Sequence, residues 1–245
     1  MNIQLDDGVQ FGLGVFETIC LRKGRPEFLE WHLERINGSL TSFGIPQQVT
    51  IEEVQEWLSE ESKDEPIEDL AALKIMVSDK NKHFLIRHNP YTEEVIEKGF
   101  ILDYSSVLRN ETSPLVYHKT MNYGDNILEK RATKQRGIDE VIFLNSKGAV
   151  TEGSTTNIFF VKEGHILTPH HSCGLLPGVM RRFVMEQVQV EEKVIEPDDI
   201  AHMEECFVTN SLMGIMTVNT IGNHSFKNDA ITRQLQELYR SRRNI

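Results

Sequence analysis

The 245-residue sequence predicts an α+β protein of two domains. Strand-like and helix-like patterns alternate along its first part, and a polar segment ending in proline (RNETSP, 109–114) then interrupts them. Beyond this segment, a helix leads into a new series of short strands. We therefore expect a small N-terminal α/β domain over 1–106, a linker over 107–114 and a larger C-terminal domain over 115–245.

The composition narrows the class of protein. Hydrophobic residues make up 39% and charged residues 26%, as in ordinary soluble globular proteins, and the net charge is -11. An acidic chain argues against general affinity for nucleic acid, and no apolar run is long enough to span a bilayer. The acidic N-terminus lacks the apolar core of a signal peptide. Cys20, Cys173 and Cys206 are far apart, which favours a reducing cytoplasm over a disulfide framework, and we expect no metal site.

The elements of the first domain follow from local patterns. Two β-rich runs flanking the turn KGRP predict a hairpin over 14–29. Apolar residues at near-helical spacing predict a helix over 30–45, and Thr50 with Glu53 forms a capping box for the next helix. The remaining elements of this domain are expected in this order: a helix over 50–61, strands over 70–79 and 83–90, a helix over 91–99 and a strand over 100–107.

The second domain combines a strand meander with helices. Pro177 and Gly178 stand at the start of one helix, and Asp198 or Asp199 can cap a short one. The expected elements are a helix over 127–137, short strands within 140–169, a helix over 175–188, a strand pair within 205–218 and an amphipathic helix over 228–244. A pocket between the two domains is the default position for a site.

Lys119 is the first candidate for chemistry. It lies in VYHKTMNYGDN (116–126), which resembles the end of a strand running into a polar turn. Most lysines are solvated surface charges. A partly buried lysine, in contrast, has a lowered pKa and can act as a nucleophile or base. This position alone leaves both interpretations open.

Other segments are ambiguous when each is considered alone. Glu152 in GAVTEGSTTNIFF is either a surface charge or a carboxylate that faces a cationic nitrogen. The helix start at Gly178 could bind phosphate through unpaired N–H groups, or be a plain turn. TNSLMG (209–214) could complete a phosphate site or be an ordinary turn, and Arg35 in HLERI is an ordinary surface arginine on this basis. FGLGVFET contains G-x-G but fails the dinucleotide fingerprint.

The order of these segments is more informative than any one of them. GVFET, HLERI, HKTMNY, VTEGSTTNIFF, LLPGVMRRF and TNSLMG together resemble the class IV aminotransferase family, the fold-type IV pyridoxal phosphate enzymes. This family includes branched-chain and D-amino acid aminotransferases and aminodeoxychorismate lyase. The resemblance extends from about Asp6 to the end and implies a two-domain, D-amino acid aminotransferase-like fold and a homodimer. Family members usually start with an additional strand, so an edge strand of the first domain is expected to be absent or short.

The resemblance assigns three catalytic residues. Lys119 matches the lysine that forms a Schiff base with pyridoxal 5'-phosphate, and Glu152 matches the glutamate that faces the pyridine nitrogen. Tyr123 matches the tyrosine near the ring oxygen of the cofactor. A glutamate at the pyridine nitrogen keeps it protonated, which strengthens the cofactor as an electron sink.

The resemblance also assigns a phosphate site. Arg35 matches the arginine that binds the cofactor phosphate. Val179 and Met180 match the helix-start residues whose backbone N–H groups bind it, and Ser211 lies where a hydroxyl residue often helps.

Within the family, the sequence favours the lyase branch. Tyr123 follows Lys119 by four residues, as in the lyases, and TNSLMGIMTV and PGVMRRF resemble lyase segments. The expected small-molecule substrate is 4-amino-4-deoxychorismate, which would yield pyruvate and 4-aminobenzoate for folate synthesis. The alternatives are an aminotransferase of branched-chain or D-amino acids and a non-catalytic cofactor-binding protein. The ligands of the substrate carboxylates stay open among Arg87, Arg109 and Asn210.

Overall fold

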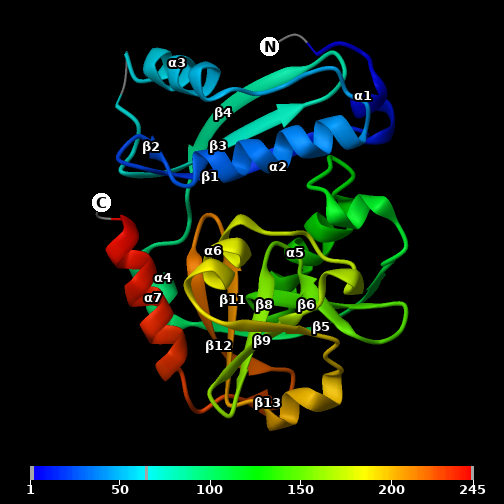
Figure 1. Ribbon diagram of the computed structural model, residues 1–245, viewed down its shortest axis with the longest axis vertical. Helices are drawn as coiled ribbons and strands as arrows, with labels where there is room; N and C mark the ends of the chain where they lie inside the picture. Colours follow the sequence, from blue (N-terminus) through cyan, green and yellow to red (C-terminus); the bar gives the residue numbers. More distant parts are fainter. Residues whose placement is uncertain (1–2, 64–65, 244–245) are drawn as a thin grey trace. The chain divides into compact units, whose positions relative to one another are not determined.

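The computed structural model describes residues 3–63 and 66–243 and contains two compact units (Figure 1). The first unit runs to Pro90 and also includes His118–Tyr123; the second comprises Tyr91–Tyr117 and the chain from Gly124 onward. The predicted α+β class is therefore confirmed, but the boundary differs from the predicted linker at 107–114. Strand β5 (Phe100–Arg109) runs into that segment and pairs with strands on both sides in the second unit, so the segment cannot serve as a linker.

The first unit is a four-stranded antiparallel sheet with helices on one face. The strand order is β2-β1-β3-β4. The bounds are α1 (Asp7–Phe11), β1 (Val15–Arg22), β2 (Arg25–Pro26), α2 (Leu29–Ser42), α3 (Ile51–Glu61), β3 (Leu70–Val77) and β4 (Lys82–His88). The strands and the helices α2 and α3 agree with the predicted hairpin, helices and strands, whereas α1 was not predicted from the sequence. Thr50 caps α3, with its hydroxyl accepting from the N–H of Glu53 at 3.2 Å. The carboxylate of Glu53, which the predicted capping box would direct back to Thr50, instead pairs with Lys82 at 3.0 Å.

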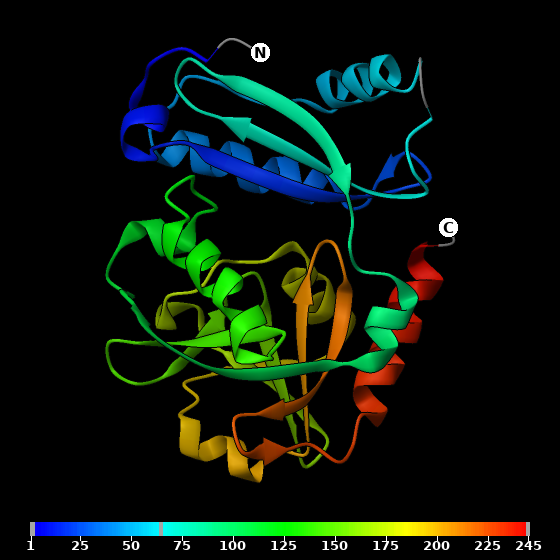
Figure 2. The same cartoon turned by 180° about the vertical axis from the view of Figure 1, so that it is seen from behind.

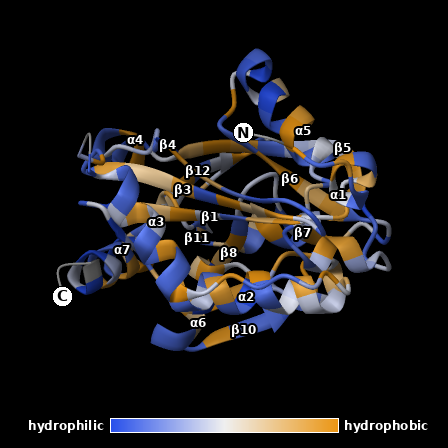
Figure 3. Ribbon diagram, turned by 90° about the horizontal axis from the view of Figure 1, so that it is seen from above, coloured by the Kyte–Doolittle hydropathy of each residue, from blue (hydrophilic) through white to orange (hydrophobic). Residues whose placement is uncertain are grey.

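The helices of this unit cover an apolar core on one face of the sheet. Leu33, Ile36 and Leu40 of α2 recur at helical spacing and are buried against Ile19 of β1 and Leu73 of β3. The same periodicity gives α2 and α3 both apolar and polar stretches in Figure 3, whereas β1 and β3 are largely apolar. One face of the sheet therefore packs against the helices.

The second unit contains a larger, mixed sheet. Its strands follow the order β10-β9-β8-β11-β12-β5-β6-β7, and β13 pairs with β12. Its strands beyond β5 are β6 (Glu140–Asn145), β7 (Val150–Gly153), β8 (Asn157–Lys162), β9 (His165–Pro169), β10 (Val190–Lys193), β11 (Glu205–Asn210), β12 (Gly214–Ile221) and β13 (His224–Ser225). Its helices are α4 (Glu93–Lys98), α5 (Gly124–Arg136), α6 (Val179–Gln187) and α7 (Ala230–Arg243), with 3-10 turns at Pro114–Tyr117, His171–Cys173 and Pro197–His202.

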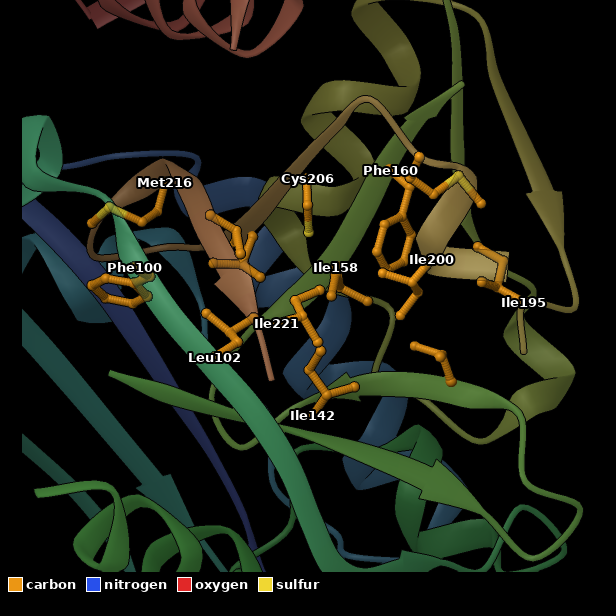
Figure 4. Close-up of a cluster of buried hydrophobic side chains, with 14 of the residues drawn as sticks. Phe100, Leu102, Ile142, Ile158, Phe160, Ile195, Ile200, Cys206, Met216 and Ile221 are labelled. Carbon is orange, nitrogen blue, oxygen red and sulfur yellow. The ribbon is translucent and has the colours of Figure 1, made fainter. Parts of the chain in front are cut away.

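This sheet is curled around an apolar core. The N–H of Val150 in β7 donates to the carbonyl of Ile195, just beyond β10, so the two ends of the strand order approach each other. Ile142, Ile158 and Phe160 point into the enclosed core (Figure 4). Helices α4 and α7 pack on β12, and α6 packs on β11 (Figure 2).

Of two smaller predictions, the one for the segment before Lys119 is wrong and the one for the last helix is confirmed. The segment before Lys119 is a 3-10 turn (Pro114–Tyr117) and not the end of a strand, although Thr120 bridges to Val15. The last helix occurs as predicted, but Asn244 lies outside the described residues. Within the described ranges, no helix combines the length and the apolar character needed to cross a membrane.

Candidate active site

Lys119 lies against two aromatic rings in the first unit. Its Nζ is 4.6 Å from the ring centroid of Phe16 and 5.2 Å from that of Tyr123. The two rings meet edge to face, with centroids 5.1 Å apart. Aromatic faces stabilise an ammonium group while displacing water from it. Lys119 is half-buried, so of the two interpretations offered by the sequence, the partly buried lysine is the one observed.

Main-chain hydrogen bonds hold the lysine segment beside β1. The N–H of Phe16 donates to the carbonyl of Lys119, and the N–H of Met121 donates to the carbonyl of Gly14, both at 2.8 Å. These bonds explain why His118–Tyr123 belongs to the first unit although the residues on either side belong to the second. The backbone of Lys119 is thereby fixed relative to the sheet.

The glycines of FGLGVFET make this close approach possible. A Cβ atom on Gly14 would lie 2.7 Å from Sδ of Met121 and 3.0 Å from the carbonyl oxygen of Val77. Gly12 adopts a left-handed φ of 72°, and a Cβ there would lie 3.2 Å from the backbone of Asn122. The G-x-G pattern that failed as a nucleotide fingerprint thus allows the lysine segment to dock.

His118 ties the same segment to α2. Its Nδ1 is 2.9 Å from the hydroxyl of Ser39, and its ring meets that of Phe43 at 4.8 Å. Burial lowers the pKa of His118, which favours the neutral ring at neutral pH. Ser39 also donates to the carbonyl of Arg35 one helical turn earlier, at 3.0 Å. The helix that carries Arg35 therefore also supports the lysine.

A buried carboxylate, Glu17, binds both polar residues of the HLERI segment. Its oxygens accept from Nε and Nη2 of Arg35 at 2.7 and 2.8 Å, and one lies 2.7 Å from Nδ1 of His32. Burial by itself would raise the pKa of Glu17, but the charges and hydrogen bonds of Arg35 and His32 hold it well below its usual range. Glu17 is therefore ionised at neutral pH.

The charge state of His32 follows from the same cluster. Burial lowers the pKa of His32 against the pull of Glu17, and the positive charges of Arg35 and Lys119 lower it further. A neutral ring that donates from Nδ1 satisfies one oxygen of Glu17. The guanidinium of Arg35 is thus oriented by a two-point contact, and its predicted role at the cofactor phosphate stays a prediction.

Glu152 is fixed at the end of β7 in the second unit. The side chain is buried, and its Oε2 accepts from the N–H of Leu176 at 3.0 Å. The amide of Asn157 and Nη2 of Arg109 each lie 3.4 Å from a Glu152 oxygen. These contacts exclude the interpretation of Glu152 as a surface charge, and its predicted role at a pyridine nitrogen stays a prediction.

Arg109 contacts other side chains of the protein, although the sequence suggested it as a ligand of a substrate carboxylate. It was one of three candidates for a substrate carboxylate, but its Nη1 donates to Oδ1 of Asn126 at 3.1 Å and its guanidinium carbon lies 4.0 Å from the ring centroid of Phe143. With Nη2 directed at Glu152, Arg109 is a partner of that carboxylate. We therefore remove it from the candidates for substrate binding.

The start of α6 lies close to Asn157, a neighbour of Glu152. Gly178 is the N-cap residue and has no capping side chain, and a Cβ there would lie 2.0 Å from Oδ1 of Asn157. Asn157 in turn pairs with Thr209 across β8 and β11. The amide of Asn157 thus connects Glu152, the helix start before Val179 and the end of β11 within one unit.

The turn after β11 completes this region. Oδ1 of Asn210 accepts from the N–H groups of Leu212 and Met213 at 3.0 and 2.9 Å, so the amide oxygen of Asn210 closes the turn, and its role at a substrate carboxylate stays a prediction. Oγ1 of Thr209 is buried and has no hydrogen-bond partner within the part of the chain described. Ser211 is half-buried.

The candidate residues therefore fall into two groups. The first unit brings Lys119 into contact with Tyr123 and fixes Arg35; the second brings together Glu152 and the start of α6 at Val179 and Met180, with Ser211 in the nearby turn.

Several supporting residues were missed by sequence reasoning. Glu17 could have been found as the single carboxylate in the apolar run VFETICL, and His32 as the residue one helical turn before Arg35. The contacts of Asn157 with Glu152 and Gly178 join segments far apart in the sequence. No local pattern signals such contacts.

The described residues form a two-unit α+β fold with a lysine beside two aromatic rings and a buried glutamate. Comparison with known proteins identifies the enzyme family to which this fold belongs. The sequence matches the class IV amino-transferase model over residues 14–221. The chain therefore belongs to the class IV aminotransferase family, whose members use pyridoxal phosphate.

Individual relatives represent two reactions within this family. The aminodeoxychorismate lyase of Bacillus subtilis is 29% identical over 96% of this chain and 87% of the relative. A putative branched-chain-amino-acid aminotransferase of Methanocaldococcus jannaschii is also 29% identical, over 96% and 88%. Among solved structures, a putative 4-amino-4-deoxychorismate lyase from Legionella pneumophila superposes with a TM-score of 0.86 at 25% identity, covering 98% of this chain and 95% of that one.

Proposed function

We propose that the protein is a pyridoxal phosphate-dependent 4-amino-4-deoxychorismate lyase, which releases pyruvate and forms 4-aminobenzoate. The observation that carries the proposal is the contact of Lys119 with Tyr123, four residues later, around the ring of Phe16. This spacing is the one expected for the lyase branch. Lyases from Bacillus subtilis and Vibrio harveyi are 29% and 28% identical to the chain.

The residues present fit the cofactor. A phosphate needs N–H and hydroxyl donors, and the second unit offers the uncapped start of α6 together with the orphaned hydroxyl of Thr209. Val179, Met180 and Ser211 would contribute donors to the phosphate from this unit, and the family resemblance assigns Arg35 to the phosphate as well. Glu152 would hold a proton at the pyridine nitrogen. When bound, the cofactor withdraws electrons from the substrate carbon that bears the amine.

The chain's own contribution to the reaction centres on Lys119. Its amine would take the proton from the substrate carbon that bears the amino group. The neighbouring C–O bond then breaks, the ring becomes aromatic, and the departing enolpyruvate is protonated on its methylene carbon by the same ammonium group. Protons balance, and no oxidant, reductant or amino acceptor is consumed. Phe16 and Tyr123 flank the amine and position it beside their rings.

An aminotransferase of branched-chain or D-amino acids is the second candidate. It is favoured by the branched-chain aminotransferases among the relatives, which match at similar identity. In that reaction the amino group stays on the cofactor and an external keto acid must remove it. A non-catalytic cofactor-binding protein is disfavoured because Lys119 and Glu152 are both present in defined surroundings.

Product analysis separates these functions. Purified protein loaded with pyridoxal phosphate is mixed with 4-amino-4-deoxychorismate and no keto acid, and 4-aminobenzoate and pyruvate are measured. Many turnovers with equal amounts of the two products are expected. No 4-aminobenzoate, together with amino transfer from leucine or D-alanine to 2-oxoglutarate, would replace the lyase by an aminotransferase.

The family resemblance also supports a homodimer in the cytoplasm that supplies 4-aminobenzoate for folate synthesis. Exposed apolar side chains gather near the start of the first unit, at Ile3, Leu5, Val9 and Phe11. A surface of this kind is typical of protein contacts. Light scattering at assay concentration is expected to give the mass of a dimer; a fully active monomer would reject this assignment.

A further inference from the structure

The face of the first unit's sheet opposite to its helices carries basic side chains. In the antiparallel register, Thr18 lies opposite Lys74, and Ala72 lies opposite Arg87. Opposed residues project to the same face, and alternate residues along a strand do so too. Phe16, Lys74 and Arg87 therefore share one face.

Lys74 and Lys119 approach the same aromatic ring. Nζ of Lys74 is 4.8 Å from the ring centroid of Phe16, and Nζ of Lys119 is 4.6 Å from it. The two ammonium groups therefore border one aromatic ring, so a small molecule held beside Lys119 lies near Lys74 as well.

Lys74 and Arg87 have no anionic partner within the part of the chain that the structure describes. No carboxylate there forms an ion pair with Lys74 or Arg87. Burial, and then the charge of Arg87, lower the pKa of Lys74. Lys82 on β4 shows the contrast, because it pairs with Glu53 of α3 at 3.0 Å. A desolvated cation beside a second cation would gain free energy from a bound anion.

We propose that Lys74, assisted by Arg87, binds a carboxylate of the substrate while the substrate's amine is held at Lys119. This rests on the proposed function, because 4-amino-4-deoxychorismate carries two carboxylates, one on the ring and one on the enolpyruvyl group. Lys74 then selects dianionic substrates over amino acids with apolar side chains. Of the substrate ligands considered from the sequence, Arg87 is thus retained and Lys74 is added.

The test measures binding separately from turnover. Chorismate carries the same two carboxylates but a hydroxyl in place of the amine, so it serves as a non-reacting probe. In Lys74→Met, the Kd of chorismate is expected to rise roughly 10- to 100-fold, as for loss of a charge-assisted hydrogen bond. The KM for aminodeoxychorismate should rise in parallel, with kcat and cofactor content little changed.

Two matched variants control for charge and fold. Lys74→Arg keeps the positive charge and should bind chorismate within a few-fold of the wild type. Lys82→Met removes the same charge from the other face of the same sheet and should leave the Kd of chorismate unchanged. Thermal unfolding of each variant verifies that it is folded; if Lys74→Met is not, Arg87→Gln carries the prediction with a smaller loss of affinity.

The outcomes separate this inference from the proposed function. If the wild type turns over aminodeoxychorismate but folded Lys74→Met binds chorismate as tightly as the wild type, the carboxylate assignment is rejected and the lyase stands. An equal loss in Lys82→Met also rejects it, because the effect is then one of overall charge. If the wild type forms no 4-aminobenzoate, the lyase and the assignment built on it fall together.

Discussion

The two units fix their candidate side chains by different means. In the first unit, a buried ion-paired cluster around Glu17 orients Arg35, and aromatic rings surround Lys119. In the second, Glu152 is held by a backbone N–H and by longer contacts to Asn157 and Arg109. The first unit should therefore respond strongly to removal of charge and to pH, whereas the second depends more on backbone geometry.

The largest effect is expected from Lys119→Ala. Loss of the amine that we propose for proton transfer should lower turnover roughly 10³-fold or more. Steady-state assays with aminodeoxychorismate measure the loss. Lys162→Ala, an exposed lysine of the second unit, is the control and should be fully active. Turnover within ten-fold of the wild type in Lys119→Ala would show that Lys119 does not transfer the proton.

Glu152→Gln probes the second unit and should lower turnover by on the order of 10²–10³. A neutral amide cannot hold a proton at the pyridine nitrogen, but it can still accept from the N–H of Leu176, so cofactor binding should survive. Absorbance of the bound cofactor is measured beside the rate. Normal turnover would show that the buried carboxylate supports the fold only.

Some features of the fold and of the candidate site could be predicted from the sequence, and others could not. Lys119 and Glu152 could be proposed as site residues because their segments occur in the order typical of the family, and the helices and most strands followed from periodicity. The boundary at Pro90 could not, because β5 pairs with β12 and β6, which come later in the chain. The partners of Arg109 are likewise set by long-range packing over Phe143, which leaves no local pattern.

Glu17→Gln tests the difference between the two units through the free energy of unfolding. A neutral partner would leave the guanidinium of Arg35 poorly compensated, at a cost of roughly 3–5 kcal/mol in the free energy of unfolding. Denaturant unfolding at neutral pH measures it, and Glu152→Gln is expected to lose less. Equal losses in the two variants would contradict the distinction between the units.

The pH dependence of stability follows from the same residue. The pKa of Glu17 is depressed in the folded protein, so the folded state binds fewer protons than the unfolded state. Its contribution is fully present well above its ordinary pKa of 4.5 and is lost progressively as the pH falls below that value. The melting temperature of the wild type should therefore fall more steeply in acid than that of Glu17→Gln; parallel curves would be inconsistent with an ionised Glu17.

Gly14→Ala should have the smallest effect. The added Cβ would press on Sδ of Met121 and on the carbonyl of Val77, of which only the Met121 side chain can move easily. The expected cost is about 1–3 kcal/mol of unfolding free energy, as for overpacking elsewhere. Gly124→Ala has no atom within 4 Å of its Cβ and, like Gly14, no positive φ, so it controls for the space around the added methyl group. A larger loss in Gly124→Ala would show that docking of the lysine segment is not the cause.

Chemical labelling of the lysine shows which amine reacts with the cofactor, and we expect it to be that of Lys119, beside the aromatic rings of the first unit. The protein is saturated with pyridoxal phosphate, reduced with borohydride, digested and mapped by mass spectrometry. We expect one labelled peptide, with the modification on Lys119. A label on Lys74, Lys130 or Lys134 in place of Lys119, or no label after saturation, would contradict it.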